Sequence, residues 1–188
     1  MKYAGIINND VVNGKGVCVS FWSQGCPHRC PGCHNPQTWE FDKGIEGNDD
    51  EVVDHIIEML RKNGVKRNLS ILGGEPLCNE NLHFTYKLID RVKKKYPDII
   101  IFIWTGYTFE ELVYAFDPTN NVIDIQECIM LEMCLRWSNV IIDGRFEKEL
   151  RDITLPLRGS SNQRVIDAQK TFRFGKIVEC EEYLNSEV

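Results

Sequence analysis

Three cysteines lie within eight residues of one another, in the string CPHRCPGC that contains Cys26, Cys30 and Cys33. Three thiols this close cannot all pair as disulfides inside the string, and such groups in a reduced protein more often bind metal or carry out redox chemistry. Thiolates on one short loop suit a soft metal centre, and the prolines and the glycine between them bend the loop so that the sulfur atoms can converge. The loop therefore predicts a metal site.

Two kinds of metal centre fit this spacing. Structural zinc takes four closed ligands, so it would need His34 or His28 beside the three thiolates. The adjacent pair Cys33 and His34 is awkward for one tetrahedral ion. An iron–sulfur cube normally takes four cysteines, and with three it leaves one iron open as a reaction site. The spacing alone favours the cluster and leaves zinc as an alternative.

The composition places this loop in an ordinary acidic domain. The chain has 188 residues, the length of one domain, and a net charge of −6. This charge disfavours nucleic-acid binding and a basic membrane-surface role. No apolar run is long enough to span a bilayer, and the N-terminal residues carry no secretory signal. We therefore expect a cytoplasmic protein with reduced thiols. The scattered cysteines are expected to be small buried hydrophobes: Cys18, Cys78, Cys128, Cys134 and Cys180.

Short apolar strands alternate with amphipathic helices along most of the chain. Strands are predicted over 17–22, 68–72, 99–104 and 140–142. Helices are predicted over 50–63, 80–96, 108–116 and 124–137. This alternation indicates βαβ units and a parallel sheet, although the pattern weakens after Arg151. A closed (β/α)8 barrel typically needs about 250 residues. The fold class we expect is therefore α/β, an incomplete parallel barrel that is open on one side.

Motif-like residues follow these strands at their ends. Gly73-Gly74-Glu75-Pro76 follows the second strand, Thr105-Gly106-Tyr107 the third and Asp143-Gly144-Arg145 the fourth, while the cysteine loop follows the first. The carboxyl ends of parallel strands share one face, where active sites are built. Each motif alone would pass for an ordinary turn. Together they are expected to converge on the cysteine loop.

This ordered set resembles the radical S-adenosylmethionine (SAM) enzymes. VNGKG at residues 12–16 resembles an element that precedes the cysteines in activases of glycyl radical enzymes. Further strings are similar, in the same order, to activases of the anaerobic ribonucleoside-triphosphate reductase: GCPHRCPGCHNPQTW, LSILGGEP, IFIWTGYTFEEL, VIIDGRF and LRGSSNQRVID. The resemblance covers most of residues 1–167, which we take as a radical SAM domain. Residues 168–188 are expected to form a C-terminal tail, and its order is left open.

The resemblance implies a [4Fe–4S] cluster on Cys26, Cys30 and Cys33, whose open iron binds the amino and carboxylate groups of SAM. One electron would then cleave SAM to methionine and a 5′-deoxyadenosyl radical, which would take hydrogen from a glycine of the partner reductase. A reduced flavodoxin-type protein is the expected electron donor. The cofactors carry the chemistry, so no catalytic side chain is expected beyond them.

The same resemblance assigns residues to the SAM pocket. Gly73 and Gly74 would let the backbone approach the methionine end of SAM, and Glu75 would place a carboxylate near its amino group. Asp143 and Arg145 resemble an Asp-x-Lys pair that lies near SAM and the target glycine in related activases.

The adenine contact departs from the common pattern. Many radical SAM enzymes have an aromatic residue directly before the third cysteine, and this chain has Gly32 there. We expect the backbone of Gly32 and the ring of His34 to contact adenine instead. His28 could hydrogen-bond near the cluster or be exposed to solvent, and we expect the exposed position. Residues that would face the partner are Tyr107, Arg158, Ser160 and Asn162.

Two other functions stay open. The chain could be an activase of another glycyl radical enzyme, of the pyruvate formate-lyase type, although the TGY and RGSSNQ strings argue against this. It could also be a non-catalytic zinc or iron–sulfur binding module. Such a module would not require Gly-Gly-Glu-Pro or converging strand ends.

Overall fold

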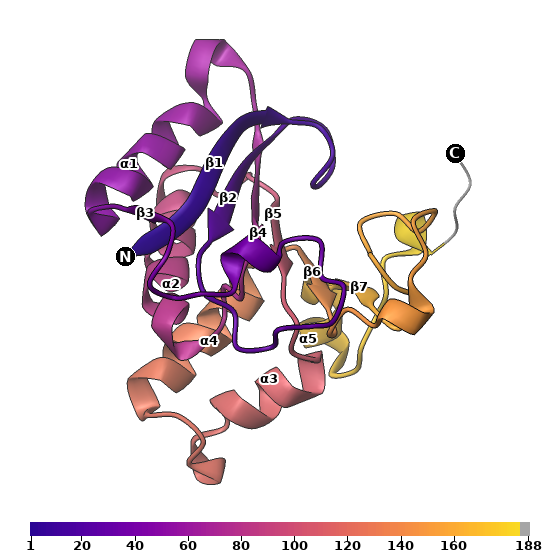
Figure 1. The fold of residues 1–188 in the computed structure, drawn as a ribbon. Coiled ribbons are helices and arrows are strands. Elements are labelled where there is room, and N and C mark those ends of the chain that lie inside the picture. Colours follow the sequence, from indigo (N-terminus) through magenta and orange to yellow (C-terminus); the bar gives the residue numbers. More distant parts are fainter. Residues whose placement is uncertain (185–188) are drawn as a thin grey trace.

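A single open β-sheet runs through the molecule (Figure 1). The computed structural model describes residues 1–184. The strand order is β3-β1-β2-β4-β5-β6-β7, and the four central strands β2, β4, β5 and β6 are parallel. Strands β1, β3 and β7 pair antiparallel at the two sides. The strands are β1 Lys2–Asp10, β2 Cys18–Ser23, β3 Ile45–Glu46, β4 Asn68–Gly73, β5 Ile101–Trp104, β6 Val140–Asp143 and β7 Arg164–Asp167. The expected α/β class with a mostly parallel, open sheet is confirmed.

The helices follow their sequence signals closely. They are α1 Asp49–Leu60, α2 Asn79–Lys95, α3 Phe109–Phe116, α4 Ile125–Trp137 and α5 Ala168–Phe174. Asn48 caps α1 by accepting from the amides of Asp50 and Glu51, and Thr108 and Asp124 form capping boxes at α3 and α4. These caps satisfy amides that have no partner inside the helix, so α1, α3 and α4 begin directly after their capping residues.

The face of the sheet that we call the outer face packs against the helices. Alternate strand residues point to one side, and on this side they are fully buried aliphatic or aromatic groups such as Phe21, Ile71 and Ile103. They join apolar residues of α1, α2 and α4 in one core cluster. This cluster supplies the main hydrophobic stabilisation of the fold, because burial of apolar surface is the dominant favourable term in folding.

The opposite, inner face carries polar and aromatic residues. Ser20 donates to the carboxylate of Asp10 at 2.6 Å, and Ser70 donates to the carbonyl of Asn13. A smaller apolar cluster that includes Phe102 and Ile142 covers the part of this face near β7. The segment between β6 and β7, residues 144–163, lies over this side of the sheet (Figure 1).

Three strands and the C-terminal segment differ from the sequence expectations, since β1, β3 and β7 are not predicted from the sequence. Lys2–Asp10 forms β1, which was not predicted because its asparagines and glycine give little apolar alternation; its pairing with β2 defines the strand. The expected tail is also not a separate segment, since Ala168 begins helix α5 and is fully buried. Glu179 and Cys180 then pair back onto β7. The last part of the expected tail, residues 185–188, lies outside the described residues.

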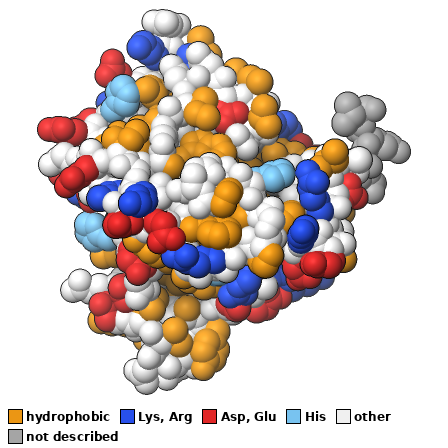
Figure 2. Space-filling view, viewed as in Figure 1, with side chains coloured by type: hydrophobic (Ala, Val, Ile, Leu, Met, Phe, Trp, Pro, Cys, Tyr) orange, Lys and Arg blue, Asp and Glu red, His pale blue; other side chains and the backbone are white. Residues whose placement is uncertain are grey.

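The surface carries charges of both signs. Figure 2 shows acidic and basic side chains interspersed over one face, with apolar side chains gathered near its centre. Within residues 1–184, no helix has both the length and the apolar character that crossing a membrane requires.

Candidate functional site

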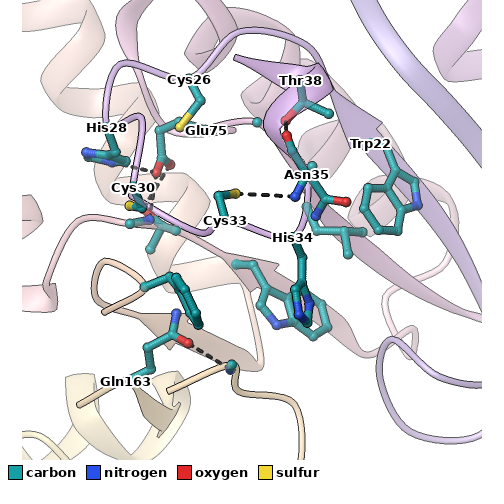
Figure 3. Close-up of a pocket in the computed structure, with 18 of the residues that line it drawn as sticks. Trp22, Cys26, His28, Cys30, Cys33, His34, Asn35, Thr38, Glu75 and Gln163 are labelled. Carbon is teal, nitrogen blue, oxygen red and sulfur yellow. Dashed lines mark hydrogen bonds and ion pairs between the residues drawn. The ribbon is translucent and has the colours of Figure 1, made fainter. Parts of the chain in front are cut away.

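A pocket of about 400 Å³ lies where the carboxyl ends of the parallel strands meet the cysteine loop (Figure 3). Its volume is in the range of small-molecule and cofactor sites. Four separate strand ends contribute to its lining, together with the cysteine loop and residues 144–163. The predicted residues in the lining are Cys26, Cys30, Cys33, His34, Gly73, Gly74, Glu75 and Arg158. The structure therefore brings the central part of the predicted site together.

The three cysteines of the loop are free and half-buried, and all three line the pocket. The sulfur of Cys33 accepts from the amide of Asn35 at 3.3 Å. Burial is the largest cause that raises the pKa of Cys26, to about 11, and the charge of Glu75 adds to it. Burial likewise raises the pKa of the Cys30 thiol. A metal centre has to displace these protons, because only the thiolate is a ligand.

The three thiolate donors suit an iron–sulfur cluster. Among residues 1–184, no group of three or more His, Cys, Asp or Glu side chains surrounds one point as a lone metal ion requires. A four-iron cube takes each cysteine on a different iron, so its ligands need not converge so closely. The two histidines weighed as a fourth zinc ligand have other partners. The His34 ring stacks near Phe146, with 6.3 Å between centroids, and His28 bonds Glu75.

The carboxylate of Glu75 is a buried hub between three loops. It is 0% exposed and accepts hydrogen bonds at both oxygens. Oε1 accepts from the Thr105 hydroxyl at 2.8 Å and the Leu77 amide at 3.0 Å. Oε2 accepts from the Gly106 amide at 2.7 Å and lies 2.9 Å from Nε2 of His28. The hub thus joins the cysteine loop to the ends of β4 and β5 (Figure 3).

The expectation of a solvent-exposed His28 is wrong. Its side chain is only 6% exposed, because the ring reaches inward to the Glu75 carboxylate. The ring also packs edge-on against Tyr107, with centroids 4.5 Å apart. A Cβ at Gly106 would lie 2.3 Å from Cδ2 of this ring, so only glycine leaves room for the histidine there.

The two glycines at the end of β4, Gly73 and Gly74, line the pocket, and the packing of the chain also requires residues without side chains there. A Cβ at Gly74 would lie 2.3 Å from the carbonyl oxygen of Gly25. The amide of Gly74 donates to Ser23 at 2.9 Å, and the amide of Glu75 donates to Gly25 at 2.8 Å. The absence of side chains therefore lets the end of β4 pack directly on the residues that lead into the cysteine loop.

The structure does not bring Asp143 and Arg145 into the lining of this pocket. Asp143 is 1% exposed and accepts from the amide of Phe109 at 2.7 Å and from Nε of Arg164 at 3.0 Å. Arg145 is exposed and pairs with Glu111 at 3.1 Å. Both residues hold the start of α3 against neighbouring segments in this arrangement.

The remaining predicted residues lie beside the pocket. Gly32 and Tyr107 do not line it, although the ring of Tyr107 packs edge-on against the ring of His28. Ser160 accepts from the amide of Glu147 at 3.2 Å, and Asn162 donates to the carbonyl of Arg145 at 2.8 Å. These two contacts order residues 144–163, of which Arg158 reaches the lining.

Sequence reasoning missed the aromatic part of the lining, which consists of Trp22, Trp39, Trp104 and Phe146. Trp104 donates its indole N–H to the carbonyl of Leu157 at 2.8 Å. The indole nitrogens of Trp22 and Trp39 are buried without a hydrogen-bond partner in the described residues. The signal was available for two of them. Trp22 and Trp104 stand at strand ends, and Trp22 directly follows the outer-face residue Phe21, which turns it inward.

Comparisons with known proteins give one consistent result. A family model described as a 4Fe-4S single cluster domain matches residues 12–166. Three similar proteins each carry the name anaerobic ribonucleoside-triphosphate reductase-activating protein. The one from Haemophilus influenzae is 36% identical over 87% of this chain and 96% of its own length. The one from Escherichia coli K12 is 36% identical over 88% of this chain and 97% of its own length. The one from Enterobacteria phage T4 is 36% identical over 88% and 93%.

Proposed function

The chain belongs to the family of anaerobic ribonucleoside-triphosphate reductase-activating proteins, and on that premise we propose that it generates the glycyl radical of such a reductase. It is a radical SAM enzyme, an oxidoreductase with a 4Fe-4S domain. The observation that carries the assignment of the site is the meeting of three cysteines with the ends of four strands in one pocket.

Cys26, Cys30 and Cys33 hold the [4Fe–4S] cluster in this proposal, because they are the three thiols that share the pocket. When bound, the cluster and SAM supply a one-electron cleavage that yields methionine and a 5′-deoxyadenosyl radical. The backbone of Gly73 and Gly74 faces the pocket at the end of β4, where it can take the methionine end of SAM. We propose that the radical SAM domain covers residues 1–167, which the family match over 12–166 supports, and that helix α5 packs onto it as a C-terminal extension.

The chain's side chains orient the cofactor and exclude water. The indoles of Trp22 and Trp104 and the side chain of Leu72 form an apolar wall, which limits side reactions of a reactive species. His34 and Phe146 provide nearly parallel rings, with an interplanar angle of 29°, beside the glycine that replaces the usual aromatic residue. We propose that this pair contacts adenine, whereas Gly32 lies outside the lining of the pocket.

The protein substrate enters from the open side of the sheet. The linear strand order leaves the barrel unclosed, so a loop that bears the target glycine can approach the pocket. In this proposal Arg158, which lines the pocket, meets that loop together with Ser160 and Asn162 of the same segment. We further propose a reduced flavodoxin-type electron donor and a cytoplasmic location, where thiols stay reduced.

The decisive experiment mixes the reconstituted, reduced protein with SAM and a candidate partner and looks for a glycyl radical by electron paramagnetic resonance (EPR). We expect the radical on the anaerobic ribonucleoside-triphosphate reductase and none on pyruvate formate-lyase. A radical on pyruvate formate-lyase alone would assign the chain to the other activase class. Zinc in place of iron and sulfide, in protein purified without oxygen, would overturn the enzyme assignment.

A further inference from the structure

Glu75 carries a negative charge into the interior without a fixed cationic partner. Within residues 1–184, its only ion-pair contact is with the ring of His28, and its other donors are two amides and a hydroxyl. A carboxylate has about four lone-pair sites, and these four donors use them. Glu75 is therefore not free to accept from the amino group of SAM, as the sequence led us to expect.

The position of this charge matters for the cysteine loop. The amide of Glu75 donates to the carbonyl of Gly25, directly before Cys26, and its carboxylate lies 2.9 Å from His28, between Cys26 and Cys30. Glu75 thus contacts the cysteine loop on both sides of Cys26, with its backbone amide before Cys26 and its carboxylate after it. Charge–charge interactions are strong in a buried, low-dielectric setting.

We propose that Glu75 is a positioning residue with a redox role: it fixes the cysteine loop on the ends of β4 and β5 and lowers the reduction potential of the cluster. Net charge, hydrogen bonding and solvent exposure set the potential of an iron–sulfur cluster. A fixed negative charge opposes the arrival of an electron, so the reduced cluster becomes a stronger reductant. This inference rests on the proposed function, since it requires the cluster.

The test uses the full chain, reconstituted without oxygen, and measures the midpoint potential by EPR-monitored titration in the absence of SAM. For Glu75→Gln we expect the equilibrium constant for one-electron reduction to rise at least tenfold, about 59 mV. Thr105→Val keeps the charge and removes one donor to it, so it should move the potential in the opposite direction. Glu132→Gln, on the surface of α4 and paired with Arg136, makes the same change in net charge. It should leave the potential within about twofold of the wild type in the same equilibrium constant.

The outcomes separate the two proposals. A wild-type chain that binds no iron and sulfide would overturn the proposed function. A loaded Glu75→Gln variant with an unchanged potential would overturn the redox role of Glu75 and leave the proposed function intact. If Glu75→Gln does not hold the cluster, Thr105→Val decides, because an unchanged or raised potential in that variant contradicts the inference. If Glu75 has a purely structural role, the variants would change the cluster content. Glu75→Gln would then not raise the midpoint potential, and Thr105→Val would not lower it.

Discussion

The outer and inner faces of the sheet divide stability from chemistry. On β4 the neighbours Ile71 and Leu72 point to opposite faces: Ile71 is fully buried in the core against the helices, and Leu72 lines the pocket. On the outer face, apolar side chains of similar size could replace one another. The inner face carries particular polar groups, such as the Glu75 carboxylate, whose role depends on the specific hydrogen bonds that they form. The difference implies that substitutions on one face change stability most and substitutions on the other change activity most.

The largest expected effect is the difference between replacing a cysteine of the pocket and replacing a cysteine of the core. Cys30→Ala should abolish cluster binding and SAM cleavage, because two thiolates cannot hold a cube that keeps one iron open. Cys128→Ala is the matched control, since Cys128 is 3% exposed on α4 and lies near the carbonyls of Ala115 and Ile123. It should keep the cluster and lose about 1 kcal/mol of stability. Iron and sulfide content and 5′-deoxyadenosine production give the result. Normal 5′-deoxyadenosine from Cys30→Ala would contradict the ligand assignment.

The next effect compares adjacent residues on one strand. Ile71→Ala should lower the free energy of unfolding by about 3 kcal/mol, because it leaves a cavity in the core. Leu72→Ala should cost less stability, because its side chain borders a pocket, and should weaken SAM binding. Urea unfolding and the KM for SAM measure the two effects. Equal losses of stability in the two variants would remove the distinction between the faces.

The smallest expected effect concerns an ion pair at the β7 edge of the sheet, where Arg164 of β7 pairs with Glu110 of α3. The hydrogen bond from Arg164 lowers the pKa of Glu110 below its ordinary 4.5. The pair therefore stabilises the fold fully above that ordinary value and loses its contribution as the pH falls through the lowered pKa. Glu110 is exposed, so Glu110→Gln should cost less than about 1 kcal/mol at neutral pH. It should also flatten the fall in melting temperature between about pH 5 and pH 3. An unchanged slope would show that the pair adds nothing.

The two faces also differ in how much of them the sequence predicts. The outer face follows from periodicity, so the four parallel strands and the helices α1 to α4 were located from local patterns. The strand β1 was not, because its pairing with β2 involves residues whose own pattern is polar. The continuation of the fold beyond β7 is likewise not predicted from the sequence. It depends on backbone hydrogen bonds that Val178 and Cys180 form with β7.

The site shows the same limit. The three cysteines and the Gly73-Gly74 pair were found because they are close in sequence. Asp143 was assigned to SAM by resemblance, whereas in the structure it bonds Arg164, 21 residues away. His28 was expected in solvent because its partner Glu75 is 47 residues away. Local spacing identifies ligands on one loop, and it does not reveal which polar groups the fold has already paired.

The sheet edges have a consequence for how the chain avoids self-association. An exposed, long edge strand is a template on which other chains can add strands and aggregate. On one side, β3 has only two residues, Ile45–Glu46, which pair with Lys2 and Tyr3, so the rest of β1 forms part of that edge. At the other edge, Ile166 of β7 is bridged by Glu179, and the amide of Cys180 donates to Val165. The edge at β7 therefore offers few free backbone groups for strand addition, and at the other edge the register irregularities of β1 against β2 interrupt a regular template.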